Sequence, residues 1–279
     1  MKKTSVLAGA TLLLAGPAFA ADLAKPVYKA PSAVAPGFTW TGCYLGADAG
    51  GAWAKQSAGT TTTGNPNTVP TPQQNVFFLE PQADTAGDLS NDGSAIGGLY
   101  VGCNYQFRSG LVLGAEADFN WTSAGGSFNG PNIAIPGGLQ SGGVSMSSNT
   151  RWAASLRARL GYAVMPNVLV YGTGGGAWAA TDYTGIDTFS PPPPNNVSLT
   201  NPLSTVFSNA QTGWVAGAGV EWAPWSNNWI LRLEYLHYQF GGVSSTVTGK
   251  DPIGLPIATT FNFGDLKLDT VRAGISYKF

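Results

Sequence analysis

Residues 271–279 read Val-Arg-Ala-Gly-Ile-Ser-Tyr-Lys-Phe, and apolar and polar side chains alternate along the whole stretch. The polar face holds Arg272, Gly274, Ser276 and Lys278. A period of two is the side-chain repeat of a β-strand. Charges on one face and apolar groups on the other are typical of a strand between lipid and a polar interior. The segment therefore predicts a strand of a transmembrane β-barrel.

Seven earlier segments of similar length also have strand character. With the last strand, the set in chain order is 40–53, 96–107, 111–121, 151–164, 168–180, 212–222, 229–240 and 266–279. The faces of 168–180 stay ambiguous because this segment contains Gly172 and Gly174–Gly176. Ten residues at about 3.3 Å each, tilted by about 45°, rise roughly 23 Å, which matches the apolar band of such barrels. We expect an all-β, eight-stranded, antiparallel up-and-down transmembrane β-barrel.

The connections alternate in length. Short links (108–110, 165–167 and 223–228) alternate with long segments (55–95, 122–150, 181–211 and 241–265). In outer-membrane barrels the short turns are periplasmic and the long loops are extracellular. We therefore expect both termini in the periplasm. The long segments are rich in Gly, Ser, Thr, Asn and Pro, which predicts flexible, weakly structured loops.

The first residues resemble an export signal. Lys2 and Lys3 precede an apolar run over residues 6–15, and Ala18-Phe-Ala20 fits a cleavage site. We expect a signal peptide over 1–20, an Ala/Pro-rich periplasmic linker over 21–37 and the barrel over 38–279. The apolar run is too short to span a bilayer as a helix.

The composition excludes other classes of protein. Charged residues make up 10% of the chain and aromatic residues 11%, with 38 glycines. Such values are typical of neither a soluble charged surface nor a disordered segment. Removing Lys2 and Lys3 changes the formal net charge from −1 to −3. With no basic cluster, nucleic acid is not an expected partner.

Charged residues occur at inward positions of the predicted strands. The acids are Glu116, Asp118, Glu221 and Glu234, and the arginines are Arg157, Arg159, Arg232 and Arg272. A charge inside a narrow lumen needs a partner or water, and the guanidinium fork suits carboxylates. The set predicts either a salt-bridge network that plugs the barrel or a polar conduit. Side chains can fill an eight-stranded barrel, which favours the plug.

Other side chains support export and membrane insertion. Tryptophans 40, 53, 121, 152, 178, 214, 222 and 229 lie near strand ends, which predicts two interfacial girdles, although core packing is the alternative. Cys43 and Cys103 lie near the same ends of adjacent strands in an exported chain. A disulfide and two small lipid-facing thiols are both compatible with this placement.

Catalysis is not expected. The single histidine, His237, shares its face with apolar neighbours near the extracellular interface, and no third member of a triad is identifiable. No Cys/His cluster has metal-ligand spacing. We expect no catalytic residue, metal or cofactor.

Several stretches resemble one family along nearly the whole chain. They are Phe38-Thr-Trp-Thr-Gly-Cys-Tyr-Leu-Gly46, Tyr100-Val-Gly-Cys-Asn-Tyr-Gln106, Leu113-Gly-Ala-Glu-Ala-Asp-Phe119, Leu156-Arg-Ala-Arg-Leu-Gly-Tyr162, Leu231-Arg-Leu-Glu-Tyr235 and the terminal strand. The chain resembles the small porin-like outer-membrane β-barrel proteins of alpha-proteobacteria, often called outer-membrane immunogenic proteins, within the OmpA-like barrel group.

The resemblance implies a surface-exposed barrel that supports envelope integrity and has no defined catalytic residues. A narrow porin for small hydrophilic solutes and a surface adhesin acting through the long loops are the alternatives. The expected partners are outer-membrane lipid and lipopolysaccharide, with host or environmental ligands possible at the loops. Phe279, an aromatic residue ending an alternating strand, resembles the signal read by the barrel-assembly machinery.

Overall fold

The computed structural model describes residues 38–64, 82–130, 140–190, 202–224, 228–250 and 256–279. The expected signal peptide and linker lie outside these residues. The strands are β1 Gly42–Gly64, β2 Gln82–Ser90, β3 Ser94–Gln106, β4 Leu111–Asn129, β5 Gln140–Met165, β6 Val168–Ser190, β7 Leu203–Trp222, β8 Trp229–Phe240, β9 Val243–Lys250, β10 Pro256–Phe263 and β11 Leu266–Lys278. Within this part of the chain, no helix is long and apolar enough to cross a membrane.

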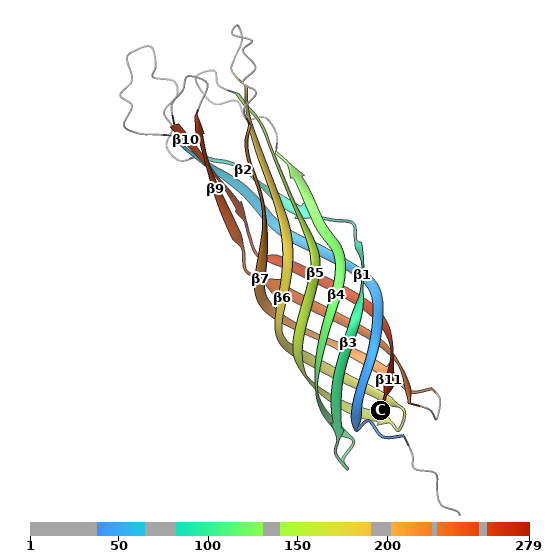
Figure 1. Ribbon diagram of the computed structural model, residues 1–279. Helices are drawn as coiled ribbons and strands as arrows, with labels where there is room; N and C mark the ends of the chain where they lie inside the picture. The colour runs from blue at the N-terminus through green and yellow to red at the C-terminus, as the bar shows by residue number, and fades with distance from the viewer. Residues whose placement is uncertain (1–37, 65–81, 131–139, 191–201, 225–227, 251–255) are drawn as a thin grey trace, which may run out of the picture. The chain divides into compact units, whose positions relative to one another are not determined.

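Eight of the strands form a closed antiparallel ring (Figure 1). The order is β1-β3-β4-β5-β6-β7-β8-β11, and β11 returns to pair with β1 from Tyr44↔Lys278 to Lys55↔Lys267. Each of these strands overlaps one of the eight segments predicted from the sequence, and β8 has the predicted bounds. Three predicted segments extend beyond their strands: 40–53 begins before Gly42, 96–107 ends after Gln106, and 266–279 ends after Lys278. The prediction of an eight-stranded antiparallel barrel is confirmed.

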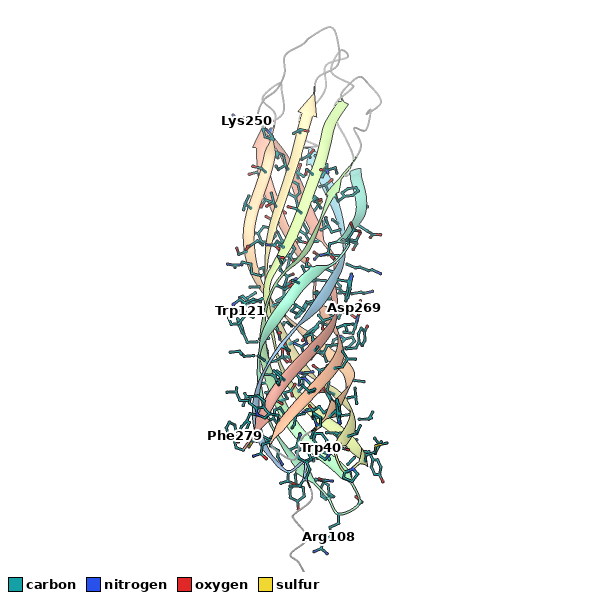
Figure 2. The ribbon with its side chains drawn as sticks, turned by 90° about the vertical axis from the view of Figure 1, so that its right-hand side faces the viewer. Trp40, Arg108, Trp121, Lys250, Asp269 and Phe279 are labelled. Atoms are coloured by element: carbon teal, nitrogen blue, oxygen red, sulfur yellow. A yellow bond between two sulfur atoms is a disulfide. The ribbon has the colours of Figure 1, made fainter. Side chains whose placement is uncertain are left out.

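Apolar side chains cover the outside of the ring. On β4, Leu113 is 50% exposed whereas Glu116, which faces inward, is 1% exposed. We call the end of the barrel near Arg108 and Phe279 the lower end and the end near Lys250 the upper end, as drawn in Figure 2. Exposed tryptophans lie at two levels, with Trp222 and Trp229 toward the lower end and Trp53, Trp121, Trp178 and Trp214 higher up.

Trp40 does not belong to a girdle, and its assignment as an interfacial residue is wrong. The side chain is 1% exposed and packs in a cluster with Val112, Leu169 and Ile230 at the lower end. The backbone amide of Trp40 donates a hydrogen bond to Oε1 of Gln106, 2.8 Å away. This bond directs the segment before β1 into the mouth of the barrel, where water is excluded from the indole.

The prediction that the four long segments are weakly structured loops is wrong over their described parts. β1, β4, β5, β6 and β7 continue above the upper tryptophans, and β2, β9 and β10 are additional strands. The β3–β4 ladder ends at Ile96↔Thr122 and the β7–β8 ladder at Gly213↔Phe240. Above these points, the sheet β4-β5-β6-β7 and the sheet β9-β10-β1-β2 enclose a common core.

This upper extension has the opposite hydrophobic pattern from the membrane part. On β5, Val144 and Met146 are buried, whereas lower on the same strand Leu156 and Leu160 are exposed outward. A bulge between Thr150 and Trp152 separates the two parts. Apolar groups face lipid where lipid surrounds the strand and face the interior where water does. A prediction that looks for strands with outward-facing apolar side chains therefore misses the extension.

The core of the extension yields a first prediction. Phe261 is fully buried in the cluster that also contains Met146 and Tyr183. We expect Phe261→Ala to destabilise the extension by about 3–5 kcal/mol, because it removes a buried ring and leaves a cavity. Limited proteolysis of the folded protein should show faster cleavage in the upper strands, with the lower barrel still resistant. Val206, which is 77% exposed on β7, provides the control. Equal proteolysis of Phe261→Ala and Val206→Ala would contradict an ordered core.

Candidate functional site: a charge network in the lumen

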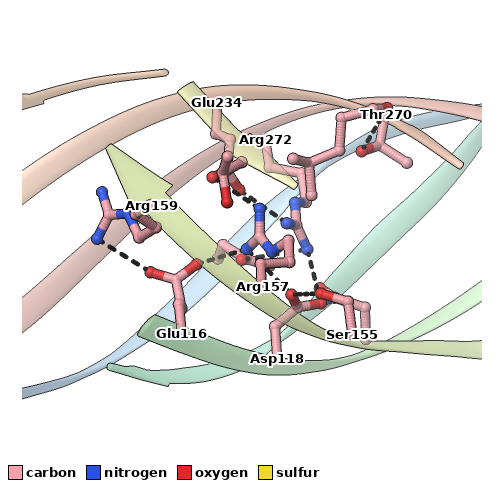
Figure 3. A network of polar contacts seen from close by, with 12 residues as sticks. Glu116, Asp118, Ser155, Arg157, Arg159, Glu234, Thr270 and Arg272 are labelled. Carbon is pink, nitrogen blue, oxygen red and sulfur yellow. Dashed lines mark hydrogen bonds and ion pairs between the residues drawn. The ribbon is translucent and has the colours of Figure 1, made fainter. Parts of the chain in front are cut away.

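The structure places all eight sequence-predicted charged residues in one buried network and adds a ninth, Asp48. They come from β1 (Asp48), β4 (Glu116, Asp118), β5 (Arg157, Arg159), β7 (Glu221), β8 (Arg232, Glu234) and β11 (Arg272). Alternation in each strand points these side chains inward. Figure 3 shows the central part of the network.

Glu116 pairs with three of the four arginines of the network. Nη1 of Arg232 lies 2.8 Å and 2.7 Å from its two carboxylate oxygens. Arg157 and Arg159 also contact it, at 2.5 Å and 3.3 Å. The hydroxyl of Tyr44 donates a hydrogen bond to Oε2 over 2.7 Å. One carboxylate on β4 therefore joins arginines from β5 and β8.

Among the arginines, Arg157 likewise pairs with several acids. Its Nη2 lies 3.0 Å from Oδ2 of Asp118, and its Nη1 lies 3.0 Å from Oε1 of Glu234. Nη2 of Arg272 contacts the other oxygen of Glu234 at 2.8 Å (Figure 3). Ser155 also donates to Asp118. The planar guanidinium thus bridges acids on opposite sides of the lumen.

Asp48 connects the network across the seam where the barrel closes. Its Oδ2 lies 3.3 Å from Nη2 of Arg232 and 3.5 Å from Nη1 of Arg272. Glu221 is held at the other side by Nη2 of Arg159, at 2.5 Å. The ion pairs therefore connect β1 with β8 and β11, and β5 with β7.

Tyrosine rings complete the lumen. The guanidinium of Arg232 lies 3.5 Å from the ring centre of Tyr100 on β3, and that of Arg159 lies 3.8 Å from the ring centre of Tyr171 on β6. Such contacts favour the cation electrostatically. Three tyrosine rings each cover a glycine directly opposite on a neighbouring strand, where a side chain would collide with the ring: the pairs are Tyr44 with Gly102, Tyr100 with Gly46, and Tyr171 with Gly219. With these tyrosines, every strand of the ring contributes to the network.

Sequence reasoning missed Asp48 and the tyrosines as members of the network. The sequence pattern did indicate Asp48, Tyr44 and Tyr100, because each occupies a position of its strand whose side chain points into the lumen. Tyr171 gave no clear signal because the glycines of its strand obscured the faces. Pairing between distant strands, such as Arg157 with Glu234, cannot be read from parity alone.

The network is sealed and carries unequal numbers of opposite charges. Its charged side chains are 0–3% exposed, so water scarcely reaches them. Five carboxylates face four guanidinium groups, which leaves one negative charge in excess if all are ionised. Among the described residues, no group of three or more His, Cys, Asp or Glu side chains could hold a metal ion. The arrangement suits mutual neutralisation rather than ligand exchange.

The remaining sequence-predicted residues lie elsewhere. Cys43 and Cys103 face each other in the β1–β3 ladder with 3.9 Å between their Cα atoms and form a disulfide. His237 is outward, as expected, and its Nδ1 lies 2.8 Å from Oδ1 of Asp269. The amide of Phe279 donates to the carbonyl of Cys43 over 2.9 Å, which extends the seam to the last residue.

Residues 7–279 match the family model of the outer membrane protein beta-barrel domain. The chain belongs to this outer-membrane β-barrel family. Its relatives include the 31 kDa outer-membrane immunogenic protein of Brucella melitensis, 31% identical over 99% of this chain and 100% of that protein. The 25 kDa outer-membrane immunogenic protein of Brucella abortus is 30% identical over 100% of this chain and 99% of that protein. The resemblance predicted from the sequence is confirmed, and the family is an outer-membrane one.

Solved barrels also resemble the chain. The outer membrane protein OprG of Pseudomonas aeruginosa is 9% identical, covers 86% of this chain and 97% of its own, and has a TM-score of 0.41. Ail, the attachment invasion locus protein of Yersinia pestis, is 13% identical, covers 82% and 99%, and has a TM-score of 0.31.

The network predicts unequal effects of neutralising its acids. Glu116→Gln should cost about 3–5 kcal/mol of unfolding free energy, since it leaves arginines buried without their shared partner. Glu221→Gln, which affects one arginine, should cost less. An exposed pair such as Arg151–Asp182 should contribute no more than about 1 kcal/mol, so Asp182→Asn is the control. Urea unfolding in lipid vesicles, followed by tryptophan fluorescence, measures all three. Equal midpoints for Glu116→Gln and Asp182→Asn would show that the network does not stabilise the barrel.

Proposed function

We propose that the protein is a structural, surface-exposed barrel that supports the outer membrane and does not conduct solutes through its lumen. The near-complete burial of the charged network is the observation that carries this proposal. A hydrated conduit would expose these charges to water, and an eight-stranded barrel is narrow enough for side chains to fill.

Apolar layers on both sides of the network support the same conclusion. Below it, Trp40, Val112, Leu169 and Ile230 pack together at the lower mouth. Above it, a cluster that includes Leu236, Tyr238, Phe240 and Leu268 occupies the lumen, and the core of the upper extension follows. A hydrated ion would have to lose its water shell at each apolar layer, which is costly.

We further propose that the lower end faces the periplasm. The four-residue link between β3 and β4 and the two-residue link between β5 and β6 lie at this end, and short turns are periplasmic in outer-membrane barrels. The upper extension then projects from the cell.

A porin is the competing function, and conductance discriminates between the two. We expect the purified protein in planar bilayers to give no reproducible current steps, because the lumen is closed at several levels. Leu113→Ala, on the lipid face of β4, should be equally silent. Reproducible wild-type steps that change on Glu116→Gln or Arg157→Gln, but not on Leu113→Ala, would establish a conducting lumen and overturn the proposal.

A surface adhesin is a second candidate, favoured by the ordered strands that extend above the upper tryptophans. Exchange of residues 65–81 and 251–255 for short Gly/Ser turns should then abolish binding of cells to a host or environmental surface. Heat-modifiable migration in gels should show that the barrel still assembles. Unchanged binding by a correctly assembled variant would exclude recognition by these residues.

We propose no catalytic role for His237. Its neighbours in the two flanking ladders are Ala216 and Asp269, and Asp269 also accepts a hydrogen bond of 2.6 Å from the hydroxyl of Tyr235. His237 and Asp269 thus belong, with Tyr235, to a polar cluster on the outside of the barrel. Recognition of Phe279 by the barrel-assembly machinery stays a prediction.

A further inference from the structure

Two lysines face each other on the outside of the barrel. Lys55 on β1 is directly opposite Lys267 on β11, and both are exposed. The next outward pair below them is Trp53 and Asp269, in the upper tryptophan level. Figure 2 shows Asp269 at about the height of Trp121 on the other side of the barrel. The lysines therefore lie about 7 Å of strand above the aromatic level, where lipid headgroups begin.

The repulsion between these two lysines is only partly compensated, by the carboxylate of Asp269 at the next outward level, which attracts Lys55. Like charges directly opposite each other in an antiparallel ladder destabilise the sheet. Neither lysine has an acid within 4.0 Å among the described side chains, whereas Arg151, another outward cation of the upper part, is paired with Asp182 at 3.1 Å. An anion between Lys55 and Lys267 would remove their repulsion.

A cavity of about 610 Å³ adjoins the pair. It lies where the neighbours of β1 change, from β11 to β10 on one side and from β3 to β2 on the other. The hydroxyl-bearing Ser57 and Ser90 contribute to its lining. A space of this size is within the range of small-ligand sites, roughly 300–1,000 Å³. A phosphorylated sugar headgroup would fit it.

The two acids of the cavity differ in what they can do. Asp265 is occupied, because its carboxylate accepts hydrogen bonds from the amide of Gly242 at 3.1 Å and from Nε2 of Gln239 at 3.2 Å. It thereby holds the link between β10 and β11. Asp88 is exposed and opposite Ser57, so it would repel an anion at its end of the cavity. An anion should therefore bind at the lysine end.

From this geometry we propose that Lys55 and Lys267 bind a phosphate group of lipopolysaccharide in the outer leaflet. The cations lie at headgroup level, the cavity offers hydroxyl donors, and a lipid anchored beside the barrel presents its phosphate there. The assignment to the outer leaflet rests on the proposed orientation of the barrel, but it does not depend on whether the lumen conducts. Binding measured in detergent tests the phosphate site independently of the orientation of the barrel and of conduction through its lumen.

The experiment titrates the full-length protein, in neutral detergent micelles, with labelled bis-phosphorylated lipid A and follows fluorescence anisotropy. Lys55→Gln and Lys267→Gln should each weaken binding about tenfold, because each removes a charge-assisted hydrogen bond to phosphate. Lys250→Gln, at the upper end, should bind as the wild type does. Asp88→Asn should bind about threefold more tightly, because it removes a repelling charge. Heat-modifiable migration of every variant checks that the barrel is folded.

Three results would overturn the proposal. Equally tight binding of dephosphorylated and phosphorylated lipid A would exclude a phosphate site. Competition by inorganic phosphate or phosphatidylglycerol on equal terms with lipid A would exclude selection of lipopolysaccharide. Wild-type affinity in folded Lys55→Gln and Lys267→Gln variants would place any lipid site elsewhere on the barrel.

Discussion

Burying nine charged side chains inside a narrow barrel is possible only if each finds a partner, and this requirement organises the structure. An isolated charge in such a place is far more costly than a paired one. Glu116 and Arg157 meet the requirement because they pair with each other and each also pairs with further charged residues, at distances of 2.5–3.3 Å. Since the partners come from different strands, satisfying one charge positions several strands at once.

The glycines and tyrosines of the lumen follow from the same requirement. The guanidinium groups of Arg159 and Arg232 lie against tyrosine rings, and each of these three rings occupies the space above a glycine. The tyrosine hydroxyls add hydrogen bonds, for example from Tyr171 to Glu234 at 2.9 Å. Glycine has a cost in a strand, but here an aromatic side chain covers the exposed backbone. The high glycine content of the chain is thus partly a consequence of its buried charges.

The sequence predicted the ring well because lipid and lumen impose opposite preferences on alternate residues. That signal identified the strands, the inward face of Glu116 and Arg157, and the outward face of His237. It failed where the surroundings change. Above the upper tryptophans the outer face meets water, so Met146 and Phe261 point inward and residues such as Thr246 and Thr260 cover the outside. Alternation did place Asp48 on the inward face. Its partners, however, come from strands that approach only when the barrel closes, and alternation within a strand does not predict this closure.

Alternation alone also leaves the strand register undetermined. A slip of one residue between neighbouring strands would turn the apolar face inward, so it is excluded. A slip of two residues keeps every face correct but moves the charges by about 7 Å, which exceeds the length of any ion pair in the lumen. At the seam, such a slip between β1 and β11 would separate Asp48 from Arg272, now 3.5 Å apart. The lipid-facing residues therefore select the faces of the strands, and the buried charges select which of the remaining registers allows the barrel to close.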